Sequence, residues 1–361
     1  MTPPDGPIPG PTLADLEPRV RAFIEADSPD PRVFRDLWLA IATAQGLRSP
    51  GDRRALGSLR PVPEEAFKTR EVACFDPAEA QAEFRSSGTT TGQPGRHLVR
   101  DLSLYRLSVV TGFRRFVLYE PRPRVFVRLI PEGTVRPHSS LSRMIDFVVA
   151  AFAEEPPIPV RQGNHLDVEA FRSACARARE SRRPLCLMAT TLDLLTLVAG
   201  MGERDEPLPP GSRVMHTGGA KASGRAVDRS ALRRDLERLL AVSPDDVVEE
   251  YGMTELMSQA YDSPRVVPGP RRFQPVPWMQ TRVVDPVSLR PVATGRQGLL
   301  LHLDLANLHT AVAILTGDLA RRVGDGFGEV RRLPGALPRG CSHEAATRTS
   351  RVTTPTPEGR P

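Results

Sequence analysis

Residues 86–97, SSGTTTGQPGRH, combine hydroxyl side chains and glycines in a way that suits a phosphate group. Each hydroxyl can donate a hydrogen bond, and each glycine lets backbone N–H groups approach a bulky anion. Loops of this kind present successive amides as an anion-binding concavity. The composition alone fits a flexible Gly/Ser/Thr connector equally well, so a phosphate site needs support from other segments.

Two further polar, glycine-bearing segments follow predicted strands: HTGGAK at 216–221 and EYGMTELMSQAY at 250–261. In an open α/β sheet, ligands bind beyond the carboxyl ends of the strands, so we expect all three segments to line one crevice. Thr254 and Glu255 supply oxygen ligands suited to Mg²⁺ carrying phosphates, and Tyr251 offers a flat face for a base. By itself, YGMTE is also typical of a strand followed by a helix with a threonine N-cap. Together, the three segments favour a nucleotide site.

Other motifs for common chemistries are absent from the sequence. GTTTGQPG is not a G-x-x-x-x-G-K-[ST] P-loop, no G-x-G-x-x-G opens a helix, and there is no G-x-S-x-G elbow. His97 and Asp101 are four residues apart and could meet on one helix face, which is typical of a capping or surface contact. The four cysteines are widely spaced: Cys74, Cys175, Cys186 and Cys341. This spacing argues against a zinc site and a disulfide scaffold and fits a reducing cytoplasm.

Composition excludes several classes of protein. The formal net charge is +6, but arginines are scattered among acids, as in RRDLERLL at 233–240, and aromatic residues make up only 5%. A nucleic-acid binder concentrates its charge on one stripe, so we expect no nucleic-acid partner. The longest apolar stretch, IDFVVAAFA at 145–153, is about half the roughly 18 residues that span a bilayer. The N-terminus lacks a secretory signal pattern, so we expect a cytoplasmic protein without a membrane span.

Strand and helix patterns alternate from about residue 81 to 252, which predicts a parallel sheet covered by helices. Helical spacing is found over 13–26, 31–45, 101–119, 139–153, 167–181, 191–201 and 228–241. Strands are predicted within 81–86, 124–130, 184–190, 212–219 and 246–252. After about 272, the pattern changes to short strands, read as MQTRVVDP, GLLLHLDL, TAVAIL, DLARRV and FGEVRRL.

The patterns divide the chain into four parts. We expect a disordered N-terminus over 1–12 and a disordered tail over 343–361. Between them we expect an α/β core over 13–270 and a β-rich subdomain with a vestigial C-terminal part over 271–342.

Four segments occur in the order of the signature segments of adenylate-forming enzymes, and the chain resembles that superfamily: SSGTTTGQPG, TGGAK, EYGMTE and TGDLA (316–320). Longer strings resemble the LuxE-type acyl-protein synthetases: LIPEGTVRPHSSLSRMID (129–146), EYGMTELMSQAYD (250–262), DLAN (304–307) and PRGCS (338–342). The resemblance covers roughly 30–345. It implies an α/β fold like the N-terminal domain of adenylate-forming enzymes, with parallel sheets covered by helices, a small β-rich subdomain, and a lid domain that is missing or vestigial.

The resemblance also implies roles for individual residues in binding ATP. The residues that would cradle the phosphates are Ser86, Ser87, Gly88, Thr89, Thr90, Thr91 and Gly92. The adenine pocket would be formed by Gly218, Gly219, Ala220, Gly252 and Tyr251, whose ring stacks on the base. Thr254 and Glu255 would face the α-phosphate and Mg²⁺. Asp318 would accept hydrogen bonds from the ribose hydroxyls, with Arg332 beside it.

The reaction that the resemblance implies begins with attack of a substrate carboxylate on the α-phosphate of ATP. The protein would position the groups, and a cation such as Arg96 would offset the developing charge. The acyl group would then pass to a protein cysteine, for which Cys341 in PRGCS is the candidate, with Arg339 lowering its pKa. A cysteine that merely ends the last strand is the alternative. Lys221 could replace the lysine of the lid.

Two positions depart from the family pattern: Arg331 stands where the family has glycine, and His343 where it has an apolar residue. We predict an AMP-forming acid–thiol ligase that uses ATP and Mg²⁺ to activate a fatty or related carboxylic acid. The acyl group would go to a protein thiol, and an acyl reductase or carrier protein could receive it. The alternatives are an acyl- or aryl-CoA ligase of the phenylacetate type and a nucleotide-binding subunit that has lost catalysis.

Overall fold

The computed structural model describes residues 11–26, 28–48, 59–86, 94–162, 165–202, 206–218 and 227–333. Its larger sheet has seven strands in the order β12-β11-β10-β9-β8-β4-β5. The strands are β4 (Val125–Arg128), β5 (Ile158–Pro159), β8 (Leu185–Thr190), β9 (Arg213–Thr217), β10 (Val247–Tyr251), β11 (Ala260–Asp262) and β12 (Gln274–Pro275). The five strands from β5 to β10 run parallel, whereas β11 and β12 add antiparallel pairs at one edge. The predicted parallel sheet is therefore confirmed.

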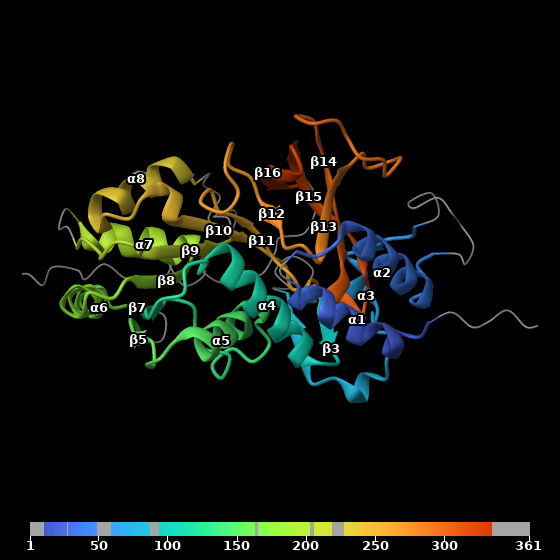
Figure 1. The fold of residues 1–361 in the computed structure, drawn as a ribbon, viewed down its shortest axis with the longest axis horizontal. Coiled ribbons are helices and arrows are strands. Elements are labelled where there is room, and N and C mark those ends of the chain that lie inside the picture. The colour runs from blue at the N-terminus through green and yellow to red at the C-terminus, as the bar shows by residue number, and fades with distance from the viewer. Residues whose placement is uncertain are drawn as a thin grey trace, which may run out of the picture.

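Helices cover both faces of this sheet, and its central strands are therefore buried on both sides. Along β8, Cys186 and Met188 pack in one apolar cluster while Leu185, Leu187 and Ala189 pack in another. The first cluster includes residues of α4 (Leu102–Phe116) and α5 (Ser140–Phe152). The second includes residues of α6 (Val168–Ser181), α7 (Thr191–Met201) and α8 (Arg229–Leu240). Figure 1 shows these helices around the sheet.

A second, five-stranded sheet lies beside the first and carries the N-terminal helices (Figure 1). Its order is β1-β15-β14-β13, with β16 paired to β15. The strands are β1 (Val62–Pro63), β13 (Met279–Val284), β14 (Gln297–Asp304), β15 (Ala313–Val323) and β16 (Gly326–Arg332). The helices are α1 (Leu13–Glu25), α2 (Pro31–Ala44) and α3 (Ala66–Thr69). The two strands predicted as TAVAIL and DLARRV are one strand, β15.

A β-hairpin lies in the chain between β1 of the second sheet and β4 of the large sheet. One prediction for this segment is wrong. Strand β2 (Ala82–Arg85) is followed by β3 (Arg96–Val99), which pairs with it antiparallel and was expected to be loop. The loop SSGTTTGQPG therefore joins two hairpin strands and does not follow a strand of the parallel sheet. His97 lies in β3 and Asp101 is the N-cap of α4, so the two do not share a helix face. The capping role expected for this pair holds for Asp101 alone.

Minor elements complete the described fold. A second small hairpin pairs β6 (Arg161–Gln162) with β7 (His165–Leu166). Short 3-10 helices span Pro77–Glu79, Pro244–Asp246 and Leu305–Asn307, the last labelled η4. Thr12, at the end of the segment expected to be disordered, instead caps α1 by a reciprocal hydrogen-bonded box with Asp15. The domain boundary at 270/271 stays a prediction, and β1 from early in the chain pairs with β15 across it.

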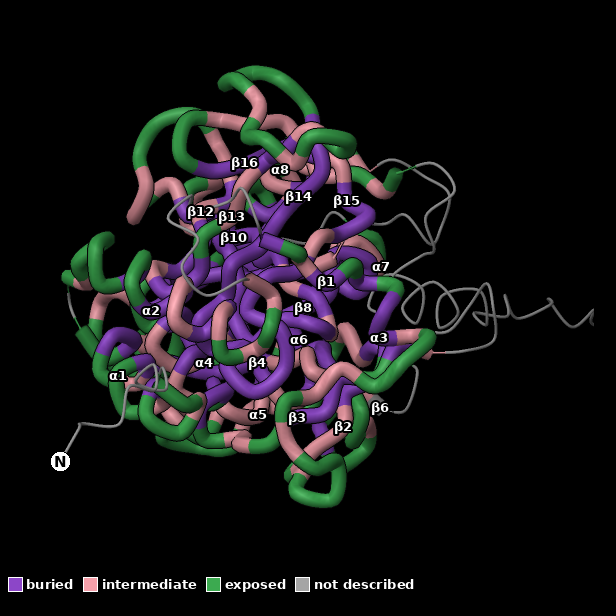
Figure 2. Tube along the Cα trace, turned by 90° about the vertical axis from the view of Figure 1, so that its right-hand side faces the viewer, coloured by how far each residue is buried: buried purple, intermediate pink, exposed green. Residues whose placement is uncertain are grey.

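Burial follows the two sheets. Figure 2 shows the buried trace gathered at the centre of the molecule, around β1, β4 and β8, with exposed loops outside. The largest apolar cluster joins α1 and α2 to the second sheet and continues to α4 and α5. The functional segments therefore stand on a continuous core that joins both sheets.

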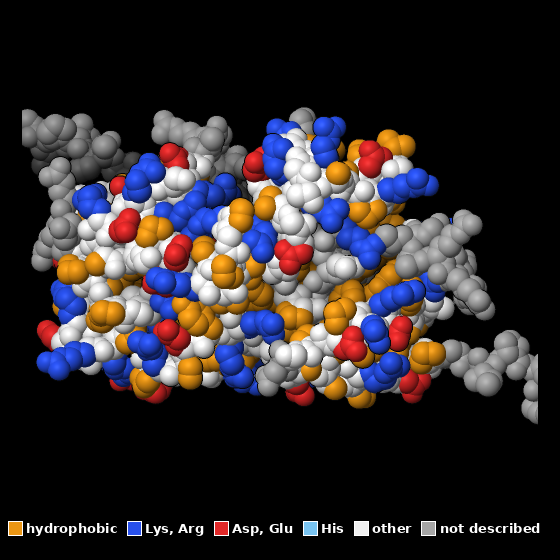
Figure 3. All heavy atoms as spheres, turned by 45° about the horizontal axis from the view of Figure 1, so that its top comes forward, with side chains coloured by type: hydrophobic (Ala, Val, Ile, Leu, Met, Phe, Trp, Pro, Cys, Tyr) orange, Lys and Arg blue, Asp and Glu red, His pale blue; other side chains and the backbone are white. Residues whose placement is uncertain are grey.

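Many of the arginines form ion pairs with nearby acidic side chains in the fold. Arg161 pairs with Asp193 at 2.7 Å and Arg213 with Asp246 at 2.9 Å, with both arginines nearly buried. On the face in Figure 3, basic side chains form several separate groups with acidic and hydrophobic side chains between them. None of the helices in the described part combines the length and apolar character needed to cross a bilayer.

Candidate active site

The carboxyl ends of β9 and β10 meet at one edge of the large sheet, as the sequence predicts. Thr217 is opposite Glu250 in the parallel register, and its hydroxyl donates a hydrogen bond to the Glu250 carboxyl. Glu250 is buried, and loss of solvation raises its pKa to about 7. A Cβ at Gly252 would stand 2.5 Å from Glu250 Oε1, so any larger residue where the chain leaves β10 would displace the Glu250 carboxyl.

The turn after β9 is fixed by α7. Thr191, the first residue of α7, donates its hydroxyl to the carbonyl of Gly218, whose φ is +80°. His216 Nδ1 lies 3.0 Å from the same hydroxyl, and burial lowers the pKa of this imidazole to about 3. A neutral, buried His216 therefore helps to hold Gly218 in place. The other residues predicted in this turn, Gly219, Ala220 and Lys221, lie outside the described residues.

The segment after Tyr251 forms no helix, so the alternative of a helix with a threonine N-cap is wrong. Residues 252–259 form a loop with one turn and no helix or strand, and two residues at η4 hold it. Buried Asp304 accepts hydrogen bonds from Met257 N at 2.9 Å and Ser258 Oγ at 2.6 Å. Asn307 Nδ2 donates to the carbonyl of Glu255 at 2.8 Å. The DLAN string thus has a structural role, because it shapes the loop that carries Glu255.

Glu255 lies against Ser86 and Gly95, the two residues where the loop leaves β2 and enters β3, called here the base of the hairpin loop. The backbone N–H groups of Ser86 and Gly95 bond to Gly95 O and Ser86 Oγ, at 2.9 and 2.8 Å, and close the loop between them. A Cβ at Gly95 would lie 2.9 Å from Ser86 Oγ and 3.4 Å from Glu255 Oε1. The hairpin base and the loop after β10 therefore meet around Gly95, although 160 residues of sequence separate Gly95 and Glu255.

His97 ties the hairpin to the same loop. Its Nδ1 lies 2.7 Å from the carbonyl of Thr254, and its Nε2 lies 3.1 Å from Thr310 Oγ1. Burial lowers the pKa of His97 to about 4, so the ring is neutral. Because a carbonyl only accepts, Nδ1 carries the proton. The Thr310 hydroxyl beside Nε2 donates its hydrogen to Asn307 Oδ1 at 2.8 Å. His97 therefore positions Thr254 through its backbone.

Asp318 and Arg332, predicted together from the resemblance, are paired across β15 and β16. Arg332 Nη1 donates to Asp318 Oδ1 at 3.2 Å, and its Nη2 donates to Glu64, which follows β1. Tyr251 Oη donates to Asp318 Oδ2 at 3.0 Å. The Asp318 carboxylate therefore connects Tyr251, at the end of β10 in the large sheet, to the second sheet.

The ring of Tyr251 is enclosed by other rings. Phe327 meets it edge-on at 5.2 Å, and Phe273 and His302 lie at 5.9 and 5.6 Å between centroids. Tyr251 is only 7% exposed. Its hydroxyl positions Asp318 in this structure, and stacking of its ring on a base stays a prediction.

Of the residues predicted for nucleotide binding, Gly218 and Gly252 follow the ends of β9 and β10, and six other described ones fall into two neighbouring groups. One contains Ser86, Thr254 and Glu255, and the other contains Tyr251, Asp318 and Arg332. The remaining predicted residues lie outside the described residues: Ser87, Gly88, Thr89, Thr90, Thr91 and Gly92, and Cys341 near the end of the chain. Sequence reasoning missed Glu64, which belongs to no pattern that marks a site, and quoted Asp304 only as part of DLAN, without a role.

The described residues offer few ligands for a metal ion. No group of three or more His, Cys, Asp or Glu among them is arranged to hold one. Glu255 is a single carboxylate, 5% exposed, beside the closed base of the hairpin loop. Because Mg²⁺ in phosphate-transfer sites takes one or two carboxylates and completes its shell with phosphates and water, Glu255 fits that ion when a nucleotide supplies the rest.

Comparison with known proteins identifies the family. Residues 57–330 match the family described as acyl-protein synthetase, LuxE. A long-chain-fatty-acid–luciferin-component ligase of Vibrio harveyi is 23% identical over 80% of this chain and 77% of that protein. A ligase of the same name from Aliivibrio fischeri is 23% identical over 71% of this chain and 67% of its own length.

Solved structures share the fold. A 2-hydroxyisobutyryl-CoA ligase, solved with 2-HIB-AMP and CoA, superposes with a TM-score of 0.55 at 17% identity, over 88% of this chain and 76% of that one. ATP-bound MatB from Rhodopseudomonas palustris gives 0.52 at 18% identity, over 91% of this chain and 63% of that one. These similarities confirm the predicted fold of adenylate-forming enzymes. The chain therefore belongs to the LuxE acyl-protein synthetase family.

Proposed function

We propose that this member of the LuxE acyl-protein synthetase family activates a fatty acid with ATP and transfers the acyl group to a cysteine thiol of a protein. Family membership supports the reaction class, and both similar ligases are named for long-chain fatty acids. The observation that carries the proposal is the meeting of Glu255 with the Ser86–Gly95 pair at the base of the hairpin loop. It brings a buried carboxylate to a loop whose composition suits phosphates.

In the first half-reaction, an oxygen of the fatty-acid carboxylate forms a bond to the α-phosphorus of ATP. The bond from that phosphorus to the bridging oxygen breaks, and pyrophosphate leaves. Ser86 and the loop after it would hold the phosphates, and Glu255 with Thr254 would hold Mg²⁺, which supplies positive charge to them. Asp318, positioned by Tyr251 and Arg332, would accept the ribose hydroxyls. Its carboxylate has about four acceptor positions, so both contacts leave room for a ligand.

In the second half-reaction, the thiol first loses its proton to solvent. The thiolate then attacks the acyl carbon, the bond from that carbon to the phosphate oxygen of AMP breaks, and AMP leaves. Cys175 and Cys186 are enclosed by the protein. This burial raises their pKa to about 12, so both thiols stay protonated. Burial also raises the pKa of Cys74, whose Sγ donates to the Thr310 carbonyl at 3.4 Å. Among the cysteines of the described residues, none is an activated nucleophile. Cys341, outside those residues, is our proposed acceptor.

The proposal extends to the surroundings of the reaction. The substrate is a carboxylic acid, ATP and Mg²⁺ are consumed or required, and an acyl reductase or carrier protein would receive the acyl group. We propose that the reaction takes place in the cytoplasm, as the spacing of the cysteines suggests.

Intact mass spectrometry after incubation with ATP, Mg²⁺ and a fatty acid, without CoA, tests acyl transfer. We expect one hydroxylamine-labile acyl addition, which Cys341→Ala abolishes. Cys74→Ala should keep it, because the Cys74 thiol is protonated and engaged.

The result that would contradict this assignment is an acyl addition that persists in Cys341→Ala and is lost in Cys74→Ala. If no variant is acylated but acyl-CoA forms when CoA is added, the protein is a CoA ligase and Cys341 has no part in transfer.

A further inference from the structure

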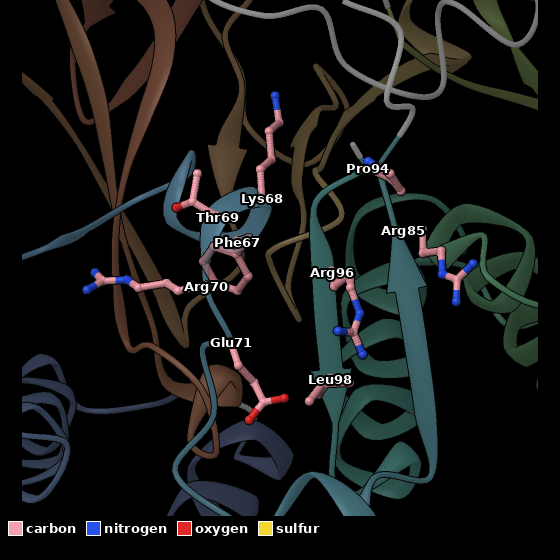
Figure 4. Close-up of a pocket in the computed structure, with 9 residues that line it drawn as sticks. All are labelled: Phe67, Lys68, Thr69, Arg70, Glu71, Arg85, Pro94, Arg96 and Leu98. Atoms are coloured by element: carbon pink, nitrogen blue, oxygen red, sulfur yellow. The ribbon is translucent and has the colours of Figure 1, made fainter. Parts of the chain in front are cut away.

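A cavity of about 460 Å³ opens beside the hairpin, between α3 and the strands β2 and β3. Four basic side chains line it: Lys68, Arg70, Arg85 and Arg96. Glu71 is the acidic residue among its lining (Figure 4). Positive charge is therefore in excess beside the loop whose composition suits phosphates.

Arg85 and Arg96 are both held by one carboxylate. Glu83 accepts from Arg85 at 2.5 Å and from Arg96 at 2.8 Å. Arg96, which the sequence suggested as a cation for the reacting phosphates, is 54% exposed in its side chain and points away from the Pro94 end of the hairpin (Figure 4). The structure therefore engages Arg96 elsewhere.

Lys68 is placed differently. Its backbone N–H bonds to Glu65 O at the start of α3, but its side chain makes no hydrogen bond or ion pair with any residue that the structure describes. Its Cγ lies 3.4 Å from the position of a Cβ on Gly95, the same point that is 3.4 Å from Glu255 Oε1. Figure 4 shows its ammonium extending toward the end of the hairpin where Pro94 lies, opposite to Glu71. The stem of Lys68 thus passes the base of the loop beside Glu255.

The segment that carries Lys68 is firmly anchored. Phe67 is 1% exposed and meets the His97 ring edge-on at 5.6 Å, which fixes α3 on β3. Four residues before Lys68, Glu64 binds Arg332 of the Asp318 group. One short stretch of chain therefore contacts both groups of predicted nucleotide-binding residues.

We propose that the ammonium of Lys68 binds the pyrophosphate portion of ATP and stabilises it as it leaves; this rests on the function proposed above. When the α-phosphorus bonds to the substrate carboxylate, the broken bond leaves its electron pair on pyrophosphate. An ammonium beside that group offsets the added charge, and lysine acts on phosphates as a mobile point charge. Lys68 and Lys221 are the two lysines in the sequence, and Lys68 is the one placed by the structure.

The test compares Lys68→Met with Arg70→Met, a control that lines the same cavity and points in another direction (Figure 4). We expect Lys68→Met to lower acid-dependent ATP–pyrophosphate exchange about 100-fold, the size of effect seen when one charge-stabilising group is removed. Lys68→Arg should recover at least a tenth of the wild-type rate, and Arg70→Met should stay within threefold.

Nucleotide binding by calorimetry separates this role from a structural one. Lys68→Met should weaken ATP binding about 10-fold or more and leave AMP binding within twofold, because AMP lacks the pyrophosphate portion. Unchanged exchange in Lys68→Met, or equal losses for ATP and AMP, would overturn the inference. A wild-type protein that binds ATP but shows no exchange would refute the proposed function instead.

Discussion

Glu255→Gln lowers acid-dependent ATP–pyrophosphate exchange by about 100-fold or more, the cost of losing one preorganised charged group at a reacting phosphate. Glutamine has the same shape but no charge. The loop itself should keep its conformation, since Asn307 bonds to the backbone carbonyl at 255 and not to the side chain. The apparent Mg²⁺ requirement should also rise, because the carboxylate is our proposed ligand.

The matched control is Glu237→Gln, an exposed glutamate on α8. Its exchange rate should equal that of the wild type. Exchange in Glu255→Gln that stays within threefold of wild type, at the same Mg²⁺ concentration, would remove Glu255 from the reaction.

Asp318→Asn raises the KM for ATP about 10- to 100-fold with little change in kcat, because hydrogen bonds to a charged group contribute about 1.5–3 kcal/mol. The carboxylate already accepts from Tyr251 and Arg332, and the amide would keep the shape while losing the charge. AMP binding should weaken by the same factor as ATP binding, since both nucleotides carry the ribose. This pattern differs from that expected for Lys68→Met.

Loss of Asp318 could act through Arg332, which it helps to hold. Glu64→Gln provides the comparison, because Glu64 is the second carboxylate that Arg332 binds. We expect a smaller rise in KM for Glu64→Gln. Equal effects would assign the loss to the position of Arg332, and AMP affinity unchanged in Asp318→Asn would exclude a ribose contact.

Local signals explain the elements that the sequence predicted well. The helices over 140–152 and 168–181 begin after Ser139 and Asp167, whose side chains accept hydrogen bonds from backbone N–H groups of the first turn. The strand 185–190 is buried at every position, as its apolar run suggested. Such features are set by residues close in sequence, and therefore they can be inferred from it.

Features that depend on distant contacts were missed. The helix that YGMTE alone would allow after Tyr251 does not form, because Thr254 O bonds to His97 and Met257 N to Asp304, so both groups are withheld from helical pairing. Thr316 and Gly317 resemble a turn, yet β15 continues through them, with a shift in its register against β14. Tertiary hydrogen bonds decided these segments, and local propensity did not.

The candidate site shows the same division. Motif order located Glu255, Tyr251, Asp318 and Arg332, which the structure then distributed into two neighbouring groups. Lys68 could not be selected from the sequence, because its assignment depends on Gly95, Phe67 and the engagement of Arg96 by Glu83. Only the folded chain shows which cation stands beside the hairpin base.

The central claim is that this site forms an acyl-adenylate, and ATP–pyrophosphate exchange by the wild-type protein tests it most directly. Radiolabelled pyrophosphate, ATP and Mg²⁺ are incubated with the protein and fatty acids of increasing chain length, without CoA. We predict that label enters ATP only when an acid is present and Mg²⁺ is not chelated. A protein that binds ATP but incorporates no label with any acid would contradict the account, and would be a nucleotide-binding subunit without adenylation activity.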